Sequence, residues 1–301
     1  YIMANNTTIH KNDIIPIHTD VVLIVDRSWS MRSMNGAPKL MVQNMINEQK
    51  EISEKNNSSC AFSLVTFDNE SIKRIDAKDV KKIKNHNDKN VSEWIEPRGS
   101  TRLIDTILEE IQFQKERKET YLKSLSKEVL ALNPKICCVI QIVTDGQDNM
   151  STHNDEELNI EVIKHKQHGA HFVFLAANQD AIQTAQCFGI DDDTAMTIDN
   201  DFDSSTHGMR CASDMVRSIT TGSSDTPRFS DLQRQMSAPS DTSTPKSSDI
   251  NILPLSSPSE RLSPPPIIRR TLPFTSNEIF NQMILPPPPP FGLTRTTNEI
   301  L

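Results

Sequence analysis

Three oxygen-bearing side chains stand at alternate positions directly after an apolar run. Asp26, Ser28 and Ser30 follow the run from Val21 to Val25. Alternate residues of a short extended loop point the same way, so one carboxylate and two hydroxyls converge on one side. Such hard oxygen ligands suit Mg²⁺ or Mn²⁺. For a lone Asp-x-Ser, the alternative is a cap on the next helix, which would bind no metal.

Two later segments carry similar groups in comparable positions. Thr101 is the exposed hydroxyl of residues 98–105, a loop that opens a stretch with apolar residues at helical spacing. Asp145 directly follows a second apolar run, residues 136–143. Both apolar runs are typical of strands buried on both faces of a parallel sheet, and open α/β sheets bind ligands at the carboxyl ends of such strands. We therefore expect Asp145 to lie at the same end of the sheet as Asp26, Ser28 and Ser30.

Taken in this order, the three loops resemble the von Willebrand factor A (vWA) domain. Its metal-ion-dependent adhesion site takes Asp-x-Ser-x-Ser from a first loop, Thr from a second and Asp from a third. The resemblance implies that Ser28, Ser30 and Thr101 offer hydroxyls to the metal. It also implies that Asp26 and Asp145 act directly or through water. With only two acidic groups the ion keeps residual positive charge, and in the family a partner's carboxylate commonly fills the open coordination position.

Three residues beside these loops are candidates for contact with a partner. Trp29 stands between the two serines, where the family often has a small residue. It either anchors a partner or folds back over the adjacent loop. Arg27 and Arg102 flank the predicted site and would steer an acidic partner, the alternative being ordinary solvated surface charge.

A second hypothesis is a Mg²⁺-dependent phosphohydrolase or phosphotransferase with Asp26 as nucleophile. That chemistry normally needs another carboxylate two residues later as acid or base, and position 28 is serine. The chain also lacks a Gly-rich loop with Lys for nucleotide phosphates. We therefore predict a binding module rather than an enzyme, with no catalytic residue.

The charge and the cysteine content limit the classes of protein to which the chain can belong. From residue 223 onward, basic and acidic side chains balance, so the formal net charge of -8 belongs to the first 222 residues. An acidic body argues against nonspecific binding to nucleic acid or anionic membranes. The five cysteines show no metal-type spacing and are typical of reduced, buried thiols. Because neither a signal peptide nor a long apolar run is found, we predict no membrane span and a cytoplasmic location, with a nuclear one left open.

Strands alternate with helices across residues 19–222, which predicts a vWA domain built as a Rossmann-like, doubly wound, mostly parallel α/β sheet with helices on both faces. Residues 1–18 are interpreted as an N-terminal extension. The strands predicted at residues 60–67 and 71–76 are joined by a tight turn, so the second pairs antiparallel at an edge. The charged stretch 77–90 is expected to be a solvated helix or loop.

Residues 223–301 have the composition of a disordered, proline-rich tail, since they hold 14 of the 18 prolines. Arg234 lies three residues before Ser237 and Pro239 two after it, a pattern that resembles 14-3-3 ligands once the serine is phosphorylated. Ser257 and Ser263 precede prolines and resemble proline-directed kinase sites. A polyproline II segment is predicted either as a ligand for EVH1, WW, SH3 and profilin-type domains or as a stiff spacer; it comprises Leu285, Pro286, Pro287, Pro288, Pro289 and Pro290.

Overall fold

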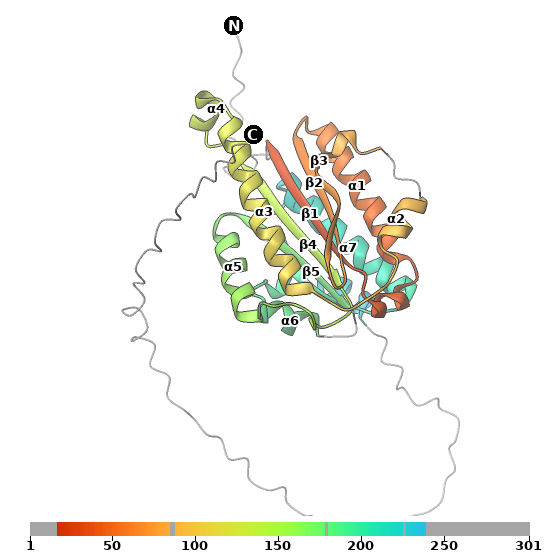
Figure 1. The fold of residues 1–301 in the computed structure, drawn as a ribbon. Helices are drawn as coiled ribbons and strands as arrows, with labels where there is room; N and C mark the ends of the chain where they lie inside the picture. Colours follow the sequence, from red (N-terminus) through yellow and green to blue (C-terminus); the bar gives the residue numbers. More distant parts are fainter. Residues whose placement is uncertain (1–16, 85–87, 178–179, 225–226, 239–301) are drawn as a thin grey trace, which may run out of the picture. The chain divides into compact units, whose positions relative to one another are not determined.

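Six strands form one sheet in the order β3-β2-β1-β4-β5-β6 (Figure 1). Strand β3 is antiparallel to β2, and every other neighbouring pair is parallel. The computed structural model describes residues 17–84, 88–177, 180–224 and 227–238. The strands are β1 His18–Asp26, β2 Ser59–Phe67, β3 Ser71–Asp79, β4 Ile136–Thr144, β5 Ala170–Ala177 and β6 Ala195–Ile198.

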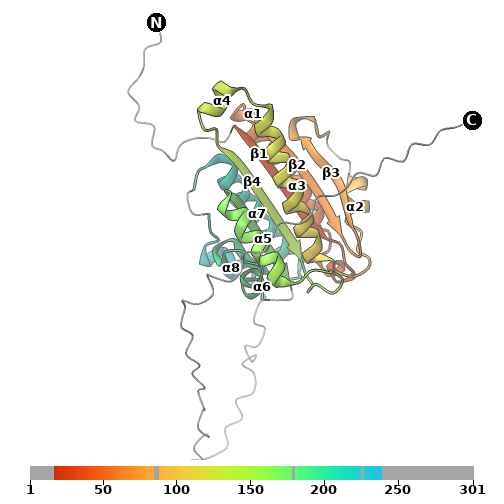
Figure 2. The same cartoon turned by 60° about the vertical axis from the view of Figure 1, so that its left-hand side comes forward.

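Helices cover both faces of this sheet (Figures 1 and 2). Helices α1 and α7 pack on one face, whereas α3, α5 and α6 pack on the other. The fold class predicted from the sequence is therefore confirmed. The α-helices are α1 Ala37–Lys55, α2 Asp88–Trp94, α3 Leu103–Ser124, α4 Lys127–Ala131, α5 Asp155–Gln167, α6 Ala181–Cys187, α7 Phe202–Thr221 and α8 Asp231–Ser237; the 3-10 helices are η1 Trp29–Met34, η2 Val80–Lys82 and η3 Asp192–Thr194.

The apolar run of β1 explains why the sheet is buried on both sides. Val21, Leu23 and Val25 belong to the core cluster under α1 and α7. Val22 and Ile24 belong to the cluster under α3 and α5, and all five side chains are fully buried. Because successive side chains of a strand point to opposite faces, an unbroken apolar run fits only a sheet that is covered twice.

The short connection between β2 and β3 makes β3 the antiparallel edge strand, as predicted. The expectation of a solvated stretch at residues 77–90 is wrong in part. Strand β3 continues to Asp79, and the side chains of Val80 and Ile83 are buried in the core cluster on the α1 side. Apolar side chains spaced three apart in a charged stretch point inward here and extend the core.

The folded body extends past residue 223, where the tail was expected to begin. Phe229 is 4% exposed and belongs to the main core cluster, and its backbone N–H donates to Asp193 O at 2.8 Å. Helix α8 follows directly, and Ser237 at its end is fully buried instead of lying in an open tail. The predicted polyproline run, Ser257 and Ser263 lie outside the described residues. Among the helices that the structure describes, none has the length and apolar character to cross a membrane.

Candidate metal centre

The first and third loops meet through their side chains. Ser28 Oγ lies 3.0 Å from Ser30 Oγ, and Ser30 Oγ donates to Asp145 Oδ1 at 2.7 Å. Asp145 is 115 residues further along the chain than Ser30. The two residues come together because β1 and β4 are neighbouring parallel strands, so the loops that leave their carboxyl ends share one side of the sheet.

The second loop brings Thr101 to the same place. A Cβ atom added at Gly146 would lie 3.3 Å from Thr101 Oγ1 and 3.5 Å from Ser30 Oγ. The Thr101 hydroxyl therefore lies close to Ser30 and to Gly146 of the third loop, which has no side chain to occupy the space. All five metal ligands predicted from the sequence lie together.

Asp26 is buried beneath this cluster, with 1% of its surface exposed. Its Oδ1 accepts from the Ser28 backbone N–H at 2.7 Å, and its Oδ2 accepts from Thr144 Oγ1 at 2.6 Å. Burial raises the pKa of Asp26 to about 7, although the hydrogen bonds from Thr144 and Ser28 oppose the rise. A nearby cation would favour the ionised carboxylate and reverse this effect.

Asp145 carries the observation that bears most directly on metal binding. Its Oδ2 is buried and has no hydrogen-bond partner among the described residues. Burial also raises the pKa of Asp145, while the bond from Ser30 opposes the rise. A buried carboxylate oxygen without a partner is costly, and a divalent cation among the neighbouring hydroxyls would satisfy it. The side chain of Ser30 is exposed, so the cluster opens to solvent on that side.

The donor set fits a hard cation better than zinc. Two carboxylates and three hydroxyls supply only oxygen, which Mg²⁺ and Mn²⁺ prefer. Within the described ranges, no group of three or more His, Cys, Asp or Glu side chains is placed to hold a metal ion. Any metal at this centre therefore depends on the Ser and Thr hydroxyls as much as on the two acids.

Two residues of the third loop hold the second loop in place, and the sequence pattern did not reveal their role. The Thr101 N–H donates to Asn149 Oδ1 at 2.9 Å, and the Asn149 N–H donates back to Thr101 O at 3.0 Å. Asp148 Oδ2 accepts from the Ile104 N–H at 2.8 Å, at the start of α3. Their position shortly after Asp145 in the same loop was the available signal, but a linear pattern does not say which amides they reach.

Asp105 ties the rest of the third loop to α3. It accepts from the Thr152 and His153 backbone N–H groups, each at 3.0 Å, and lies 2.7 Å from His153 Nδ1. Burial alone would raise the pKa of Asp105, but these hydrogen bonds hold that pKa well below its usual range. The carboxylate is therefore ionised at neutral pH and stabilises the loop that carries Asp145.

Arg27 does not stand at the rim, which corrects the expectation that it contacts a partner. Its side chain is 3% exposed, and its guanidinium lies 2.9 Å from Asp68 Oδ2. Arg98 Nε contacts the same oxygen at 2.6 Å, and the Arg98 N–H donates to Arg27 O. The Arg27 guanidinium therefore braces the first loop against the turn between β2 and β3, because a buried guanidinium needs a carboxylate partner.

Arg102 forms ion pairs with two acidic residues, whereas the Trp29 side chain is exposed to solvent. The Arg102 guanidinium lies 3.1 Å from Asp105 and 2.9 Å from Glu109, so its charge is neutralised within the protein. Trp29 is 57% exposed and does not fold away, although the Arg32 guanidinium lies 5.4 Å from the ring centroid. Of the three predicted contact residues, Trp29 alone presents a large free surface beside the centre.

A cleft of about 380 Å³ opens next to the centre at Gly146. Leu103 and Phe188 contribute apolar surface to it, and Asp148, Asp155 and Asp180 contribute acidic side chains. The centre is thus flanked by an exposed aromatic ring and an acidic cleft.

No family model matches the chain, and no curated protein matches it by sequence. Three solved structures similar to it are proximal thread matrix protein 1 of the mussel byssus, a von Willebrand factor type A protein from Catenulispora acidiphila and the ArnB paralog VWA2 from Sulfolobus acidocaldarius. They are 17%, 10% and 13% identical over 68%, 67% and 65% of this chain, with TM-scores of 0.43, 0.40 and 0.40. The matched part spans 47%, 43% and 44% of their own lengths, less than half of each. At these identities and TM-scores, the likeness adds nothing about the site, a metal or a partner.

Proposed function

We propose that this chain is a vWA-type interaction module that binds a carboxylate of a partner protein through Mg²⁺ or Mn²⁺. The observation that carries the proposal is the buried, unpartnered Asp145 Oδ2 beside a cluster of hydroxyls. A bound cation would supply the electrostatic partner that the Asp145 Oδ2 oxygen lacks. The proposed ligands are Asp26, Ser28, Ser30, Thr101 and Asp145.

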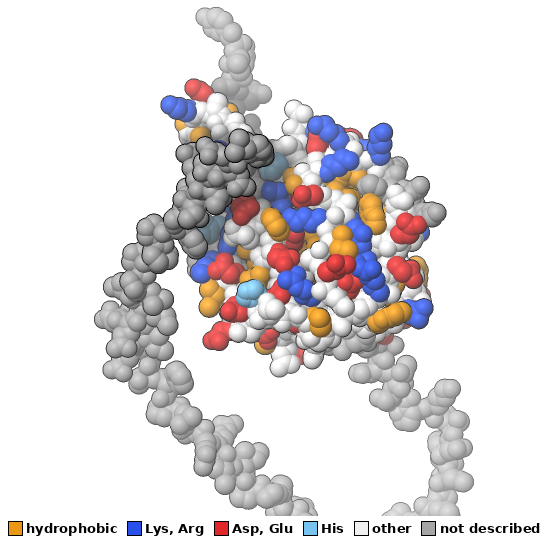
Figure 3. Space-filling model, in the orientation of Figure 1, with side chains coloured by type: hydrophobic (Ala, Val, Ile, Leu, Met, Phe, Trp, Pro, Cys, Tyr) orange, Lys and Arg blue, Asp and Glu red, His pale blue; other side chains and the backbone are white. Residues whose placement is uncertain are grey.

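The arrangement supports binding of an external anion at the ion. The exposed side of the cluster lies at Ser30, so a coordination position facing solvent would be within reach of a partner's carboxylate. Trp29 would add apolar contact area beside it. On the face drawn in Figure 3, acidic and basic side chains of the described residues are interspersed without a large block of one sign. Specificity for the partner would then come from the metal centre and from Trp29 beside it.

The phosphohydrolase alternative is less well supported. A nucleophilic carboxylate must present an oxygen to the substrate phosphorus, yet Asp26 is 1% exposed and both its oxygens already accept hydrogen bonds. Position 28 also offers a hydroxyl instead of the acid or base that such an enzyme requires.

Metal binding is tested by titrating Mn²⁺ into the full chain and following free Mn²⁺ by electron paramagnetic resonance. Asp145→Asn removes the charge of the unpartnered oxygen and should weaken the affinity at least about tenfold. Asp155→Asn is the matched control, since this exposed acid lies in the neighbouring cleft but outside the donor set. Equal affinities for the two variants would contradict the proposed ligand set.

The partner's chemistry is tested by selecting peptides on the immobilised chain in Mg²⁺ and eluting them with EDTA. We expect the eluted peptides to share an Asp or Glu whose replacement by the amide abolishes binding. Peptides that stay bound in EDTA, or that tolerate the amide, would contradict carboxylate recognition even if the metal itself binds.

A further inference from the structure

Residues 227–238 pack against the edge of the sheet at β6, and none of the residues proposed as metal ligands takes part in this contact. The Arg234 guanidinium donates to Ala195 O, at the start of β6, and to Asp192 O at 2.7 Å. The Asp199 N–H, just after β6, donates to Ser237 O at 2.8 Å. Helix α8 thus satisfies backbone groups at both ends of an edge strand that would otherwise be open to pairing.

The Ser237 side chain is poorly accommodated in this docked position. It is fully buried, and its Oγ has no hydrogen-bond partner in the part of the chain that the structure describes. A Cβ added at Gly208 of α7 would lie only 3.4 Å from that oxygen, so the site has little spare room. A buried hydroxyl without a hydrogen-bond partner destabilises the state that buries it, so alanine would suit the docked state at least as well. The hydroxyl therefore contributes nothing to docking.

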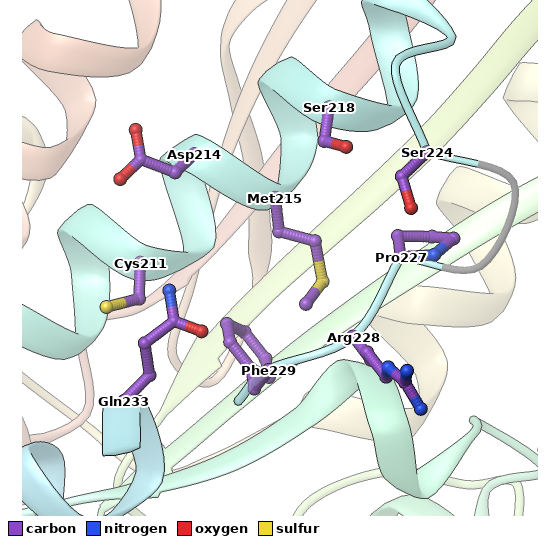
Figure 4. Close-up of a pocket in the computed structure, with 9 residues that line it drawn as sticks. All are labelled: Cys211, Asp214, Met215, Ser218, Ser224, Pro227, Arg228, Phe229 and Gln233. Carbon is purple, nitrogen blue, oxygen red and sulfur yellow. The ribbon is translucent and has the colours of Figure 1, made fainter. Parts of the chain in front are cut away.

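The attachment of α8 is slight for a segment of its length. Ser237 is the only buried residue of the helix, whereas Leu232 and Met236 are 64% and 55% exposed. A cleft of about 320 Å³ lies between α7 and the described residues Ser224 and 227–233, and Figure 4 shows Phe229 and Met215 among its lining residues. Segments with so few buried contacts open at low free-energy cost. Phe229 and Arg234 are the main anchors.

We infer that Ser237 is a phosphorylation site concealed by docked α8, and that phosphate on Ser237 and docking of α8 exclude one another. When α8 leaves the body, Arg234 is released from Ala195 and Asp192 and lies three residues before a free hydroxyl. A kinase then transfers the γ-phosphoryl group of ATP. The P–O bond to Ser237 Oγ forms, the bond to the bridging oxygen of ADP breaks, and the hydroxyl proton passes to the kinase's base.

The phosphate keeps the segment undocked because of its size and charge. It brings a charge of about −1.5 to −2 to a position with no exposed surface, while Arg234, the cation of the same helix, is held by the carbonyls of Ala195 and Asp192. The released segment would present Arg234 and phosphorylated Ser237 together, which suits a partner domain that clamps phosphate with an arginine cluster.

Hydrogen exchange in the full chain tests whether charge at position 237 releases α8. Ser237→Glu should speed exchange of the Asp199 and Phe229 amides about tenfold or more, because their acceptors, Ser237 O and Asp193 O, move away. The control Gln235→Glu adds the same charge at an exposed position of α8 and should leave both amides unchanged. Unchanged exchange in Ser237→Glu, or equal acceleration in both variants, would overturn the inference.

A kinase assay gives a second test that does not depend on the folding of Ser237→Glu. The full chain is incubated with an arginine-directed Ser/Thr kinase and labelled ATP, beside Phe229→Ala, which loosens docking. Phosphate at residue 237 should appear severalfold faster in Phe229→Ala, and Ser237→Ala should lose that label without a lower melting temperature. If neither the unchanged full chain nor Phe229→Ala acquires phosphate at residue 237, the proposed site is contradicted. A marked drop in the melting temperature of Ser237→Ala would also contradict it.

Discussion

Thr144 Oγ1 donates a hydrogen bond of 2.6 Å to Asp26 Oδ2, joining the last residues of two neighbouring strands, β4 and β1. The same hydroxyl accepts from the Gly146 N–H at 3.2 Å. Thr144 therefore orients the buried carboxylate and shapes the backbone turn that carries Asp145. It links the first and third loops beneath the proposed metal.

Thr144→Val should remove this bond while keeping the shape of the side chain. The buried Asp26 Oδ2 would lose its partner, so we expect the free energy of unfolding to fall by about 1–3 kcal/mol at neutral pH. Urea denaturation measures the change. The same substitution at exposed Thr120 of α3 is the control and should cost less than about 1 kcal/mol. Equal losses would show that the bond contributes nothing specific.

The pKa of Asp26 predicts an unusual dependence of stability on pH. In the metal-free fold this pKa is about 7, against 3.8 in the unfolded chain, so the folded state binds more protons between these values. The contribution of Asp26 to stability should therefore fall as pH rises from about 4 to 7, by at most about 4 kcal/mol. Urea denaturation in EDTA across this range measures it, and Asp26→Asn should lack this part of the slope.

Metal affinity should show the opposite trend for the same reason. A proton on Asp26 competes with the cation, so Mn²⁺ should bind more tightly as pH rises and level off above about 7. Titrations at several pH values measure this. An affinity that does not change between about pH 5.5 and 7.5 would mean that Asp26 is already ionised in the metal-free protein.

Gly146→Ala should weaken metal binding without unfolding the protein. The new Cβ would stand 3.3 Å from Thr101 Oγ1, so this hydroxyl must shift by a few tenths of an ångström, and 3.5 Å from Ser30 Oγ, an ordinary van der Waals contact. Ligand sites tolerate little displacement, and we expect roughly a tenfold loss of Mn²⁺ affinity. Calorimetric titration measures it. Gln147→Ala, at the exposed next residue, should bind as the unchanged chain does.

Arg27 and Arg98 share Asp68 but should differ in their contribution to stability. Arg27→Met removes the buried partner and should cost about 3 kcal/mol or more, since Asp68 is itself 2% exposed. Arg98 is half exposed, so Arg98→Met should lower the free energy of unfolding much less than Arg27→Met does. Chemical denaturation of both variants checks the order. A larger loss for Arg98 would contradict the bracing role assigned to Arg27.

The local pattern of the chain was enough to predict the sheet and the five proposed ligands. Unbroken apolar runs such as Val21 to Val25 fit only strands covered on both faces, and the polar residues that follow emerge at the carboxyl ends. Parallel neighbours bring those ends together whatever the details of packing. For that reason Asp26 and Asp145 could be placed at one end of the sheet from the sequence, whereas Thr101, which precedes α3 and follows no strand, was assigned through the family resemblance.

Other features depended on contacts between residues far apart in the chain. Arg27 looked like a surface charge because its partner, Asp68, lies on another strand end, and Ser237 looked like part of a free tail because Phe229 beside it docks on a distant core. Whether a charged or polar side chain is buried depends on the groups that surround it in space. The sequence determined which residues stand at the strand ends; the tertiary structure alone decided which of their neighbours are buried and which face solvent.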